Sequence, residues 1–519
     1  MNQRFVNNSF LKSLKRYFKF DTYQAILKKE IIGGISTFLA MAYIIAINPS
    51  IIGLSPIEPW NAPDTTFASQ YQGGLFLSTV ISSCVATFIM GMYARIPVAL
   101  APGMGLNAFF AFTVAQQIGF SSALTVTILS GIGYFIVVIT PAREKISKMI
   151  PSNLKLAIGV GIGFFIAYVG LQNTGIIVKN SSDSLVSNLG NLGHPMVLLA
   201  IVLLVVGLVL HYAKVPNGII ITMILGAIIL IPMVVLNATG VEGYSADNIN
   251  PLIVGYKNFE TFPSVLKAAW EGFANVEMWK NPITYIGVLS FLYMDFFDTT
   301  GTLITIDKSI NLSQKDIDWL KKASYVDAIS TIMGASIGAT TVTSFVESTV
   351  GVSAGARTGF ASIITALCFG LSIALWPIIQ IFMPVGAYQP ITGPILIIVG
   401  TIMINQIKHF EWQILIDIPT LFITIIVMTL SNSIAYGIAF GTITFVLLNG
   451  SLGIIQLLFK KSKKIINTLQ IPMSENGVNI IAREFYYCKR LNWTLILISV
   501  LSIAYIILQN GMTYLGWFI

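Results

Sequence analysis

The chain has 519 residues, of which 55% are hydrophobic and 10% are charged, and its mean hydropathy is +0.79. Soluble domains carry roughly 25% charged residues, so this composition excludes a soluble globular protein and indicates a polytopic membrane protein. The net charge of +8 is expected on the loops, because Lys and Arg collect on cytoplasmic connections. We therefore expect the protein to contact a lipid bilayer and not to bind nucleic acid.

The predicted elements are membrane-spanning helices, each of which needs about 20 apolar residues. The sequence predicts fourteen, at residues 30–54, 72–93, 97–116, 120–140, 153–171, 195–213, 217–237, 283–305, 323–339, 341–355, 357–380, 390–407, 412–430 and 432–459. With the N-terminus inside, every Lys and Arg falls on the inner side except Lys179, Lys257, Lys267 and Lys280. We therefore expect a multi-pass protein of the plasma membrane with a cytoplasmic N-terminus.

Two of these spans differ from ordinary helices. The third, PVALAPGMGLNAFFAF (97–112), has two prolines and two glycines before Asn107, and the tenth, TTVTSFVESTVGVSAGAR (340–357), has hydroxyls and glycines around Glu347. Irregular backbone at membrane depth is tolerated only where it is buried in protein or lines a cavity. Because the two lie seven spans apart, the sequence predicts two inverted seven-span repeats with spans 3 and 10 broken at the binding site.

Polar residues in the spans predict the chemistry of this site. A carboxylate accepts N–H bonds from a planar ring, an amide both donates and accepts, and burial raises the pKa of a carboxyl group so that it can take up a proton. These properties suit a small, flat, neutral heterocycle that travels with a proton. The predicted substrate-binding residues are Asn107, Asp295, Asp298, Thr299, Phe345, Glu347 and Ser348, and the predicted proton-coupling residues are Asp295, Glu347 and Asp327.

Structural alternatives stay open for several of these residues. Asp295 and Asp298 are three residues apart and are expected to share a helix face, yet Asp298 could instead bond a neighbouring helix. Asp327 could pair at the interface with Lys321 or Lys322. Phe345 could serve packing alone. The three cysteines show no Cys-x-x-Cys spacing, so we expect no disulfide framework, no metal and no other cofactor.

Five stretches of the sequence are similar to those of one transporter family. The sequence resembles the nucleobase–cation symporter family two (nucleobase–ascorbate transporters, or xanthine–uracil permeases), and within it the AzgA-like hypoxanthine/adenine/guanine permeases. The stretches are STFLAMAYIIAINPSII (36–52), ALAPGMGLNAFFAF (99–112), FLYMDFFDTTGTL (291–303), TTVTSFVESTVGVSAGARTGFASI (340–363) and SNSIAYGIAFG (431–441). Together they cover the chain from about residue 30 to 460.

The resemblance implies a core domain of spans one to four and eight to eleven, and a gate domain of spans five to seven and twelve to fourteen. It implies proton-coupled import of purine bases by movement of the core against the gate. The residues that match the family's polar positions are Asn107, Asp295, Asp298, Glu347 and Asp327. In one departure, Glu347 lies four residues before Gly351, whereas other branches place the acid or amide three before, where this chain has Ser348.

These inferences divide the chain into eight parts. They are a cytoplasmic basic tail (1–29), the first half of the core with span five of the gate (30–171), gate spans six and seven (172–237), an extracellular loop (238–282), the second half of the core (283–380), gate spans twelve to fourteen (381–460), a cytoplasmic segment (461–492) and an extra C-terminal apolar segment (493–519). The sequence leaves open whether the last segment crosses the membrane and whether the chain forms a homodimer.

Three other kinds of membrane protein share some of these features. An anion exchanger shares the predicted architecture but would favour positive charge at the site, whereas the polar residues here are acidic. A uracil or xanthine transporter of the same fold is the nearer alternative. An intramembrane aspartyl protease would also use paired acids, but its Gly-x-Gly-Asp motif is absent from the sequence. The sequence therefore predicts a transporter and not an enzyme.

Overall fold

The computed structural model describes most of the chain. The described residues are 15–55, 65–140, 151–178, 187–215, 217–236, 257–310, 318–382, 388–431 and 434–458, with the isolated positions 13, 496, 499, 500 and 503. The predicted cytoplasmic segment 461–492 lies outside the described residues. So do residues 1–12 of the predicted basic tail and, apart from four isolated positions, the predicted apolar segment 493–519.

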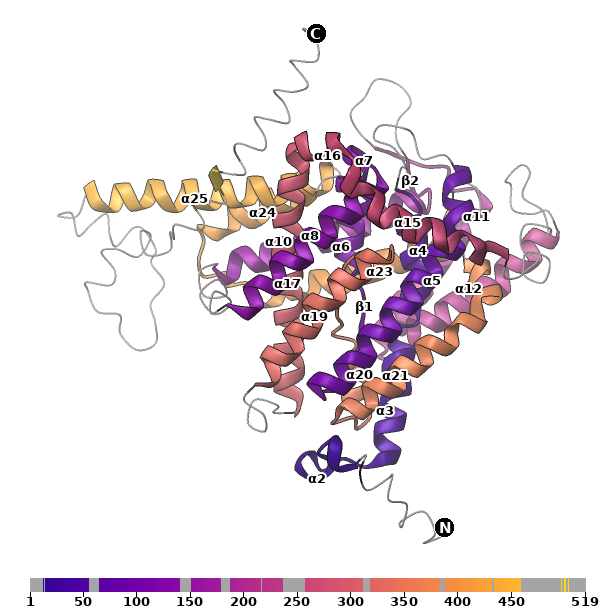
Figure 1. Cartoon of the computed structure of the whole chain (residues 1–519). Helices are drawn as coiled ribbons and strands as arrows, with labels where there is room; N and C mark the ends of the chain where they lie inside the picture. The colour runs from indigo at the N-terminus through magenta and orange to yellow at the C-terminus, as the bar shows by residue number, and fades with distance from the viewer. Residues whose placement is uncertain are drawn as a thin grey trace, which may run out of the picture. The chain divides into compact units, whose positions relative to one another are not determined.

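Helices make up most of the described chain, and Figure 1 shows them from indigo to yellow in chain order. The first are α2 (Phe20–Tyr23), α3 (Leu27–Met41), α4 (Tyr43–Ile52), α5 (Thr65–Ile89), η2 (Met90–Ala94), β1 (Leu100–Pro102), α6 (Met104–Phe109), η3 (Phe110–Val114), α7 (Ala115–Ile118) and α8 (Phe120–Ile139). Next come α10 (Ser152–Asn173), β2 (Ile177–Val178), β3 (Asn188–Leu189), α11 (Pro195–Tyr212), α12 (Gly218–Val235), η4 (Lys257–Thr261), α15 (Phe262–Glu271), η5 (Gly272–Ala274), α16 (Val276–Lys280) and α17 (Pro282–Ile310). The last are α19 (Trp319–Ser336), β4 (Val342–Ser344), α20 (Ser348–Ser353), α21 (Gly359–Leu371), η6 (Ser372–Leu375), α22 (Trp376–Ile379), η7 (Gln380–Phe382), α23 (Thr392–Ile404), η8 (Asn405–His409), α24 (Asp417–Leu430) and α25 (Ile434–Leu458).

The predicted class, an all-α polytopic membrane protein with two broken spans, is confirmed. Each predicted span contains a helical element, and within the described residues eight helices are long and apolar enough to cross a membrane. Short helices follow the breaks at β1 and β4, which is why spans three and ten do not count among the eight. The total of fourteen spans stays a prediction.

The chain divides into two compact units. The first comprises Met1–Thr140 and Gly170–Ile395, and the second comprises Pro141–Val169 and Leu396–Ile519. The three divisions fall just after α8, inside α10 and inside α23. Every residue of the predicted site belongs to the first unit.

Two groups of helices pack around the paired strands β1 and β4 of the first unit, and Figure 1 shows β1 between them. In one group α21 lies against α3 and α5, and in the other α8 lies against α17 and α19. Strand β1 packs on α5, whereas β4 packs on α17 and α19. The paired strands therefore contact both groups.

Small residues allow α3 to approach its neighbours closely. A Cβ atom on Gly33 would lie 2.8 Å from the carbonyl oxygen of Gly351, and one on Gly34 would lie 2.5 Å from that of Ala361. Such contacts are typical of helices that pack in a membrane, where close backbone approach increases van der Waals contact. The sequence GG at the start of span one thus fixes how near α3 lies to α20 and α21.

The second unit is held by a buried polar contact and by apolar packing. Asn153 donates from Nδ2 to Oδ2 of Asp417 at 2.7 Å and accepts from the backbone N–H of Glu411 at 3.0 Å. Helices α24 and α25 pack against each other. The buried apolar residues of this unit include Ala157, Val160, Phe410 and Leu421.

Candidate functional site

The breaks in spans three and ten form one structure. Strands β1 and β4 pair antiparallel, in the register Leu100 to Ser344, Ala101 to Thr343 and Pro102 to Val342. Backbone hydrogen bonds of 3.1 Å continue the ladder at both ends, from Phe345 to Ala99 and from Gly103 to Thr341. Two segments about 240 positions apart therefore meet at their non-helical stretches, as the positions of the breaks predicted.

Local sequence explains why the helices stop here. Pro102 has no backbone N–H to give to a helix, and the turn before β4 contains two residues in the left-handed region, Gly338 at φ +88° and Thr340 at φ +69°. Glycine adopts this region without strain, whereas a β-branched residue does so rarely. The backbone at Thr340 is therefore strained and must be held by its surroundings.

Asp295 and Asp327 form a buried acidic pair. Asp327 accepts from the backbone N–H and the hydroxyl of Ser344, each at 2.8 Å, and from the hydroxyl of Thr299. Oδ2 of Asp295 accepts from the hydroxyl of Thr331 at 2.7 Å, while its Oδ1 meets no hydrogen-bond donor among the described residues. Both acids have no exposed surface. Asp327 thus fastens β4 to α17 and α19, and it does not form the interfacial ion pair that was its alternative.

Asp298 and Glu347 form an accessible acidic pair. Asp298 is exposed, and no hydrogen bond from the described residues reaches it, so the alternative that it bonds a neighbouring helix is not observed. Glu347 is half-buried and accepts from the hydroxyl of Tyr43 at 2.9 Å. The two carboxylates are near enough for their charges to interact. Among the predicted acids, these two are therefore the ones with surface that a ligand can contact.

Asp295 and Asp298 do not share an environment, although they lie three residues apart on α17. Three residues turn a helix through about 300°, so the two side chains point about 60° apart. Asp295 lies on the edge that packs toward Thr331 of α19, and Asp298 lies on the edge left open beside Glu347. The two acids therefore lie on adjacent edges of one side of α17 and differ in their exposure.

The remaining predicted residues are mostly occupied by the protein itself. Asn107 is fully buried, with hydrogen bonds to Asn48 and Thr340. The hydroxyl of Thr299 also contacts that of Thr343 at 2.8 Å. The hydroxyl of Ser348 accepts from the backbone N–H of Ala99 at 3.0 Å, and the ring of Phe345 is 8% exposed.

Sequence reasoning missed several polar residues that contact the site. They are Tyr43 and Asn48 of α4, Thr79 of α5, Thr331 of α19 and Thr340 before β4. Each is a polar side chain inside an apolar span, and that is the signal that could have found them. Glu30 was also missed: it is buried and accepts hydrogen bonds around the start of α21.

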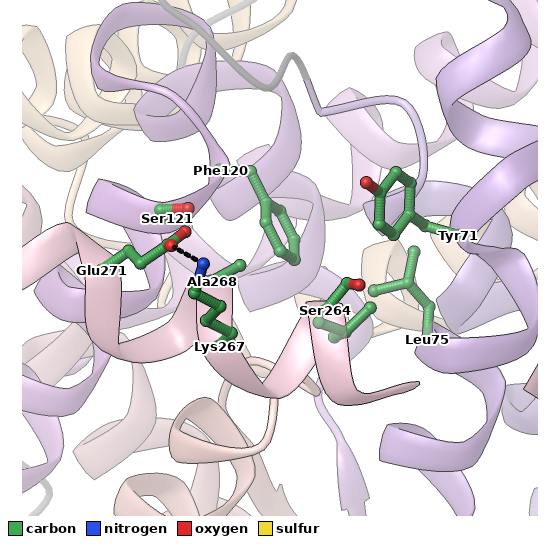
Figure 2. A pocket seen from close by; sticks show the side chains of 9 residues that line it. Tyr71, Leu75, Phe120, Ser121, Ser264, Lys267, Ala268 and Glu271 are labelled. Atoms are coloured by element: carbon green, nitrogen blue, oxygen red, sulfur yellow. Dashed lines mark ion pairs between the residues drawn. The ribbon is translucent and has the colours of Figure 1, made fainter. Parts of the chain in front are cut away.

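A separate pocket of about 270 Å³ lies between α5, α8 and α15. Figure 2 shows Tyr71 and Phe120 with Ser264 around it, and the ion pair of Lys267 with Glu271 at 3.0 Å. None of the predicted site residues lines this pocket. We therefore place the candidate site at the paired strands.

Comparison with known proteins identifies the family. A family model described as Permease family matches residues 28–440. The chain belongs to this permease family. The resemblance to xanthine–uracil permeases drawn from the sequence is thereby confirmed.

Relatives in the permease family match most of this chain. The guanine/hypoxanthine permease PbuG of Bacillus subtilis is 36% identical over 438 residues, covering 83% of this chain and 93% of that protein. The adenine permease AdeQ of Escherichia coli K12 is 31% identical over 453 residues, covering 86% and 92%. A solved structure, the transmembrane domain of the cyanobacterium bicarbonate transporter BicA, has a TM-score of 0.53 at 15% identity and covers 79% of this chain and 97% of its own. At that identity the likeness shows the fold alone.

Proposed function

We propose that this permease imports the purine bases hypoxanthine, adenine and guanine together with protons, without converting them chemically. One observation carries the proposal: Asp298 and Glu347, two carboxylates that a ligand can reach, lie beside the paired strands of a chain whose relatives are named purine permeases. An acidic site disfavours an anion and suits a neutral base with N–H donors. The proposal is thus supported by the chemistry of the site and by the names of the relatives.

The exposed parts of the site suggest how a base would bind. Carboxylate oxygens of Asp298 and Glu347 can accept N–H bonds from the edge of a purine. Phe345, two residues before Glu347, is mostly buried, and the 8% of it that is exposed can give the base an apolar contact. We propose that these three residues contact the base. The buried members of the predicted site, Asn107, Asp295, Thr299 and Ser348, would support that surface from behind.

Acids within the membrane spans that have no basic partner support proton coupling. Among the described residues, none of Asp295, Asp327 and Glu347 forms an ion pair with Lys or Arg. A charge at membrane depth is costly, and binding a proton removes it. We propose that Asp295 and Glu347 carry the coupled proton. Asp327 accepts three hydrogen bonds, two of them from Ser344 of β4, and we propose that it links protonation to the position of β4.

The helix contacts of the first unit are consistent with inverted repeats. If span one corresponds to span eight, then α3, α5 and α21 correspond to α17, α19 and α8. The contacts of α21 with α3 and α5 are then matched by those of α8 with α17 and α19, and β1 is matched by β4. This correspondence supports alternating access of a core of spans one to four and eight to eleven against a gate. The proposed location is the plasma membrane, with the N-terminus in the cytoplasm; a homodimer is a further proposal.

Competition uptake tests the proposed function. Cells that express the chain would receive radiolabelled hypoxanthine with an excess of adenine, guanine, xanthine, uracil or sulfate, with and without a protonophore. We expect competition by adenine and guanine but not by xanthine, uracil or sulfate, and loss of accumulation when the proton gradient collapses. Competition by uracil or xanthine would indicate the related transporter class, and sulfate uptake would indicate an anion exchanger. Accumulation that survives the protonophore would rule out proton coupling.

A further inference from the structure

A chain of buried hydrogen bonds connects four segments of the first unit. Thr340 donates to Oδ1 of Asn107, and Nδ2 of Asn107 donates to Oδ1 of Asn48. Nδ2 of Asn48 donates to the hydroxyl of Thr79 at 2.8 Å, which donates to the carbonyl oxygen of Leu75 at 2.7 Å. The four polar side chains have no exposed surface. The chain joins the turn before β4 to α6, α4 and α5.

The direction of this hydrogen-bond chain is determined at one end. A carbonyl oxygen only accepts, so the Thr79 hydroxyl gives its single proton to Leu75 and must accept from Asn48. The amide nitrogen of Asn48 therefore faces Thr79, and its oxygen faces Asn107. In turn Asn107 directs its nitrogen to Asn48 and its oxygen to Thr340, which has to donate. Thr79 thus orients both amides and, through them, the hydroxyl of Thr340.

The far end of the chain reaches a strained residue. Thr340 is β-branched, and its φ of +69° is a conformation that such residues rarely adopt. Strain of this kind persists only where the surroundings hold it. Thr340 lies two residues before the start of β4, and Glu347 lies three residues after its end. A change at Thr340 therefore moves the backbone that presents Glu347.

We infer that Asn48 is a positioning residue for substrate: through Asn107 it holds the strained turn at Thr340 and so sets the place of Glu347. Thr79 has the same positioning role, one hydrogen bond further from Thr340 than Asn48 is. The inference rests on the proposed function, because it concerns the residue that we expect to contact the base. It predicts that affinity for the base depends on side chains that never touch it.

The test is the kinetics of hypoxanthine uptake by variants, with membrane abundance and monodispersity in detergent measured alongside. For Asn48→Ala we expect KM to rise about tenfold, the effect of losing roughly one well-formed hydrogen bond, with the maximal rate per inserted molecule nearly unchanged. Thr79→Val, which keeps the shape but loses the hydroxyl, should show a similar rise. Thr79→Ser should restore normal KM. Ser83→Ala is the matched control, because Ser83 lies one turn along α5 and its hydroxyl donates to the backbone carbonyl oxygen of Thr79 within that helix at 2.7 Å.

A second variant tests the route through Thr340. Glycine adopts a positive φ without strain. Thr340→Gly therefore removes the backbone strain that the hydrogen bonds from Asn48 and Asn107 are proposed to hold. Adding Asn48→Ala to Thr340→Gly should then leave KM where Thr340→Gly alone sets it. Independent effects that add in the double variant would overturn the inference.

Three other results would also overturn it. An unchanged KM in Asn48→Ala or Thr79→Val would show that the chain of hydrogen bonds does not position Glu347. Equal loss of abundance in Thr79→Val and Thr79→Ser, with normal KM in the surviving protein, would show a role in folding alone. Absence of purine uptake by the unaltered chain would reject the proposed function and this inference with it, and that result is distinguishable from the first two.

Discussion

The hydroxyl of Tyr43 donates a hydrogen bond of 2.9 Å to Oε1 of Glu347, across 304 positions of the chain. Tyr43 is 1% exposed and belongs to α4, whereas Glu347 directly precedes α20. A neutral donor orients a carboxylate without neutralising it. The bond therefore holds Glu347 in place while leaving its charge available to a ligand.

Replacing Tyr43 by Phe removes only this donor. We expect KM for hypoxanthine to rise about tenfold, which corresponds to about 1.4 kcal/mol, because Glu347 gains rotational freedom. Uptake kinetics normalised to membrane abundance would measure the effect. Tyr285→Phe, which loses an exposed bond to the carbonyl of Trp279, is the control and should behave as the unaltered chain does. An unchanged KM in Tyr43→Phe would mean that the bond does not orient Glu347 in the working transporter.

Replacing Glu347 by Gln removes its charge at nearly constant volume. We expect transport to be abolished while the protein stays folded in the membrane, because the proposed site loses both an acceptor for the base and a place for the proton. Initial uptake rates and detergent monodispersity would be measured together. Glu277→Gln, at the exposed start of α16, is the matched control. Near-normal uptake by Glu347→Gln would assign Glu347 a structural role.

The two aspartates of α17 should differ in what their removal does. We expect Asp295→Asn to abolish proton-coupled accumulation. The amide cannot bind the proton, and at this buried position no water molecule can take over the role of the carboxylate. Asp298→Asn should be milder, with KM raised about tenfold and coupling retained, since an exposed amide can still bond the base. Uptake at a series of proton gradients would separate the two effects. The reverse order of severity would exchange the roles of these residues.

Glu30 should contribute to stability rather than to transport. Its carboxylate accepts from the backbone N–H of Arg357 at 2.7 Å, from the hydroxyl of Thr358 at 3.0 Å and from the N–H of Ala361 at 3.2 Å. It thereby accepts from donors at and just before the start of α21, where backbone N–H groups lack the usual helical acceptor four residues back.

For Glu30→Ala we expect a loss of about 2–4 kcal/mol in stability, since buried donors are left unpaired. Thermal unfolding in detergent would show a lower Tm. Glu30→Gln, which keeps one acceptor oxygen, should lie between. Glu277→Ala at an exposed position should change Tm little. A Tm for Glu30→Ala equal to that of the unaltered chain would show that the contacts add nothing.

Hydropathy and charge in the sequence were enough for the class of fold. Apolar runs of membrane length can be stable only as helices, so the spans follow from local composition. The breaks at 97–112 and 340–357 were also predictable, because proline and glycine act on their own backbone. The acids of α17 and Glu347 were recognised for a similar reason, since a charge in an apolar span stands out in the sequence itself.

Tertiary structure alone decided which of these acids a ligand can reach. Asp295 and Asp298 look alike in the sequence, yet one is buried against Thr331 and the other is exposed beside Glu347. The partners Tyr43 and Asn48 were equally hidden from sequence reasoning. Local rules describe residues within a few positions of each other, whereas these contacts form between segments tens to hundreds of positions apart. Such pairings depend on how the helices pack, and side-chain packing is specified by the whole chain at once.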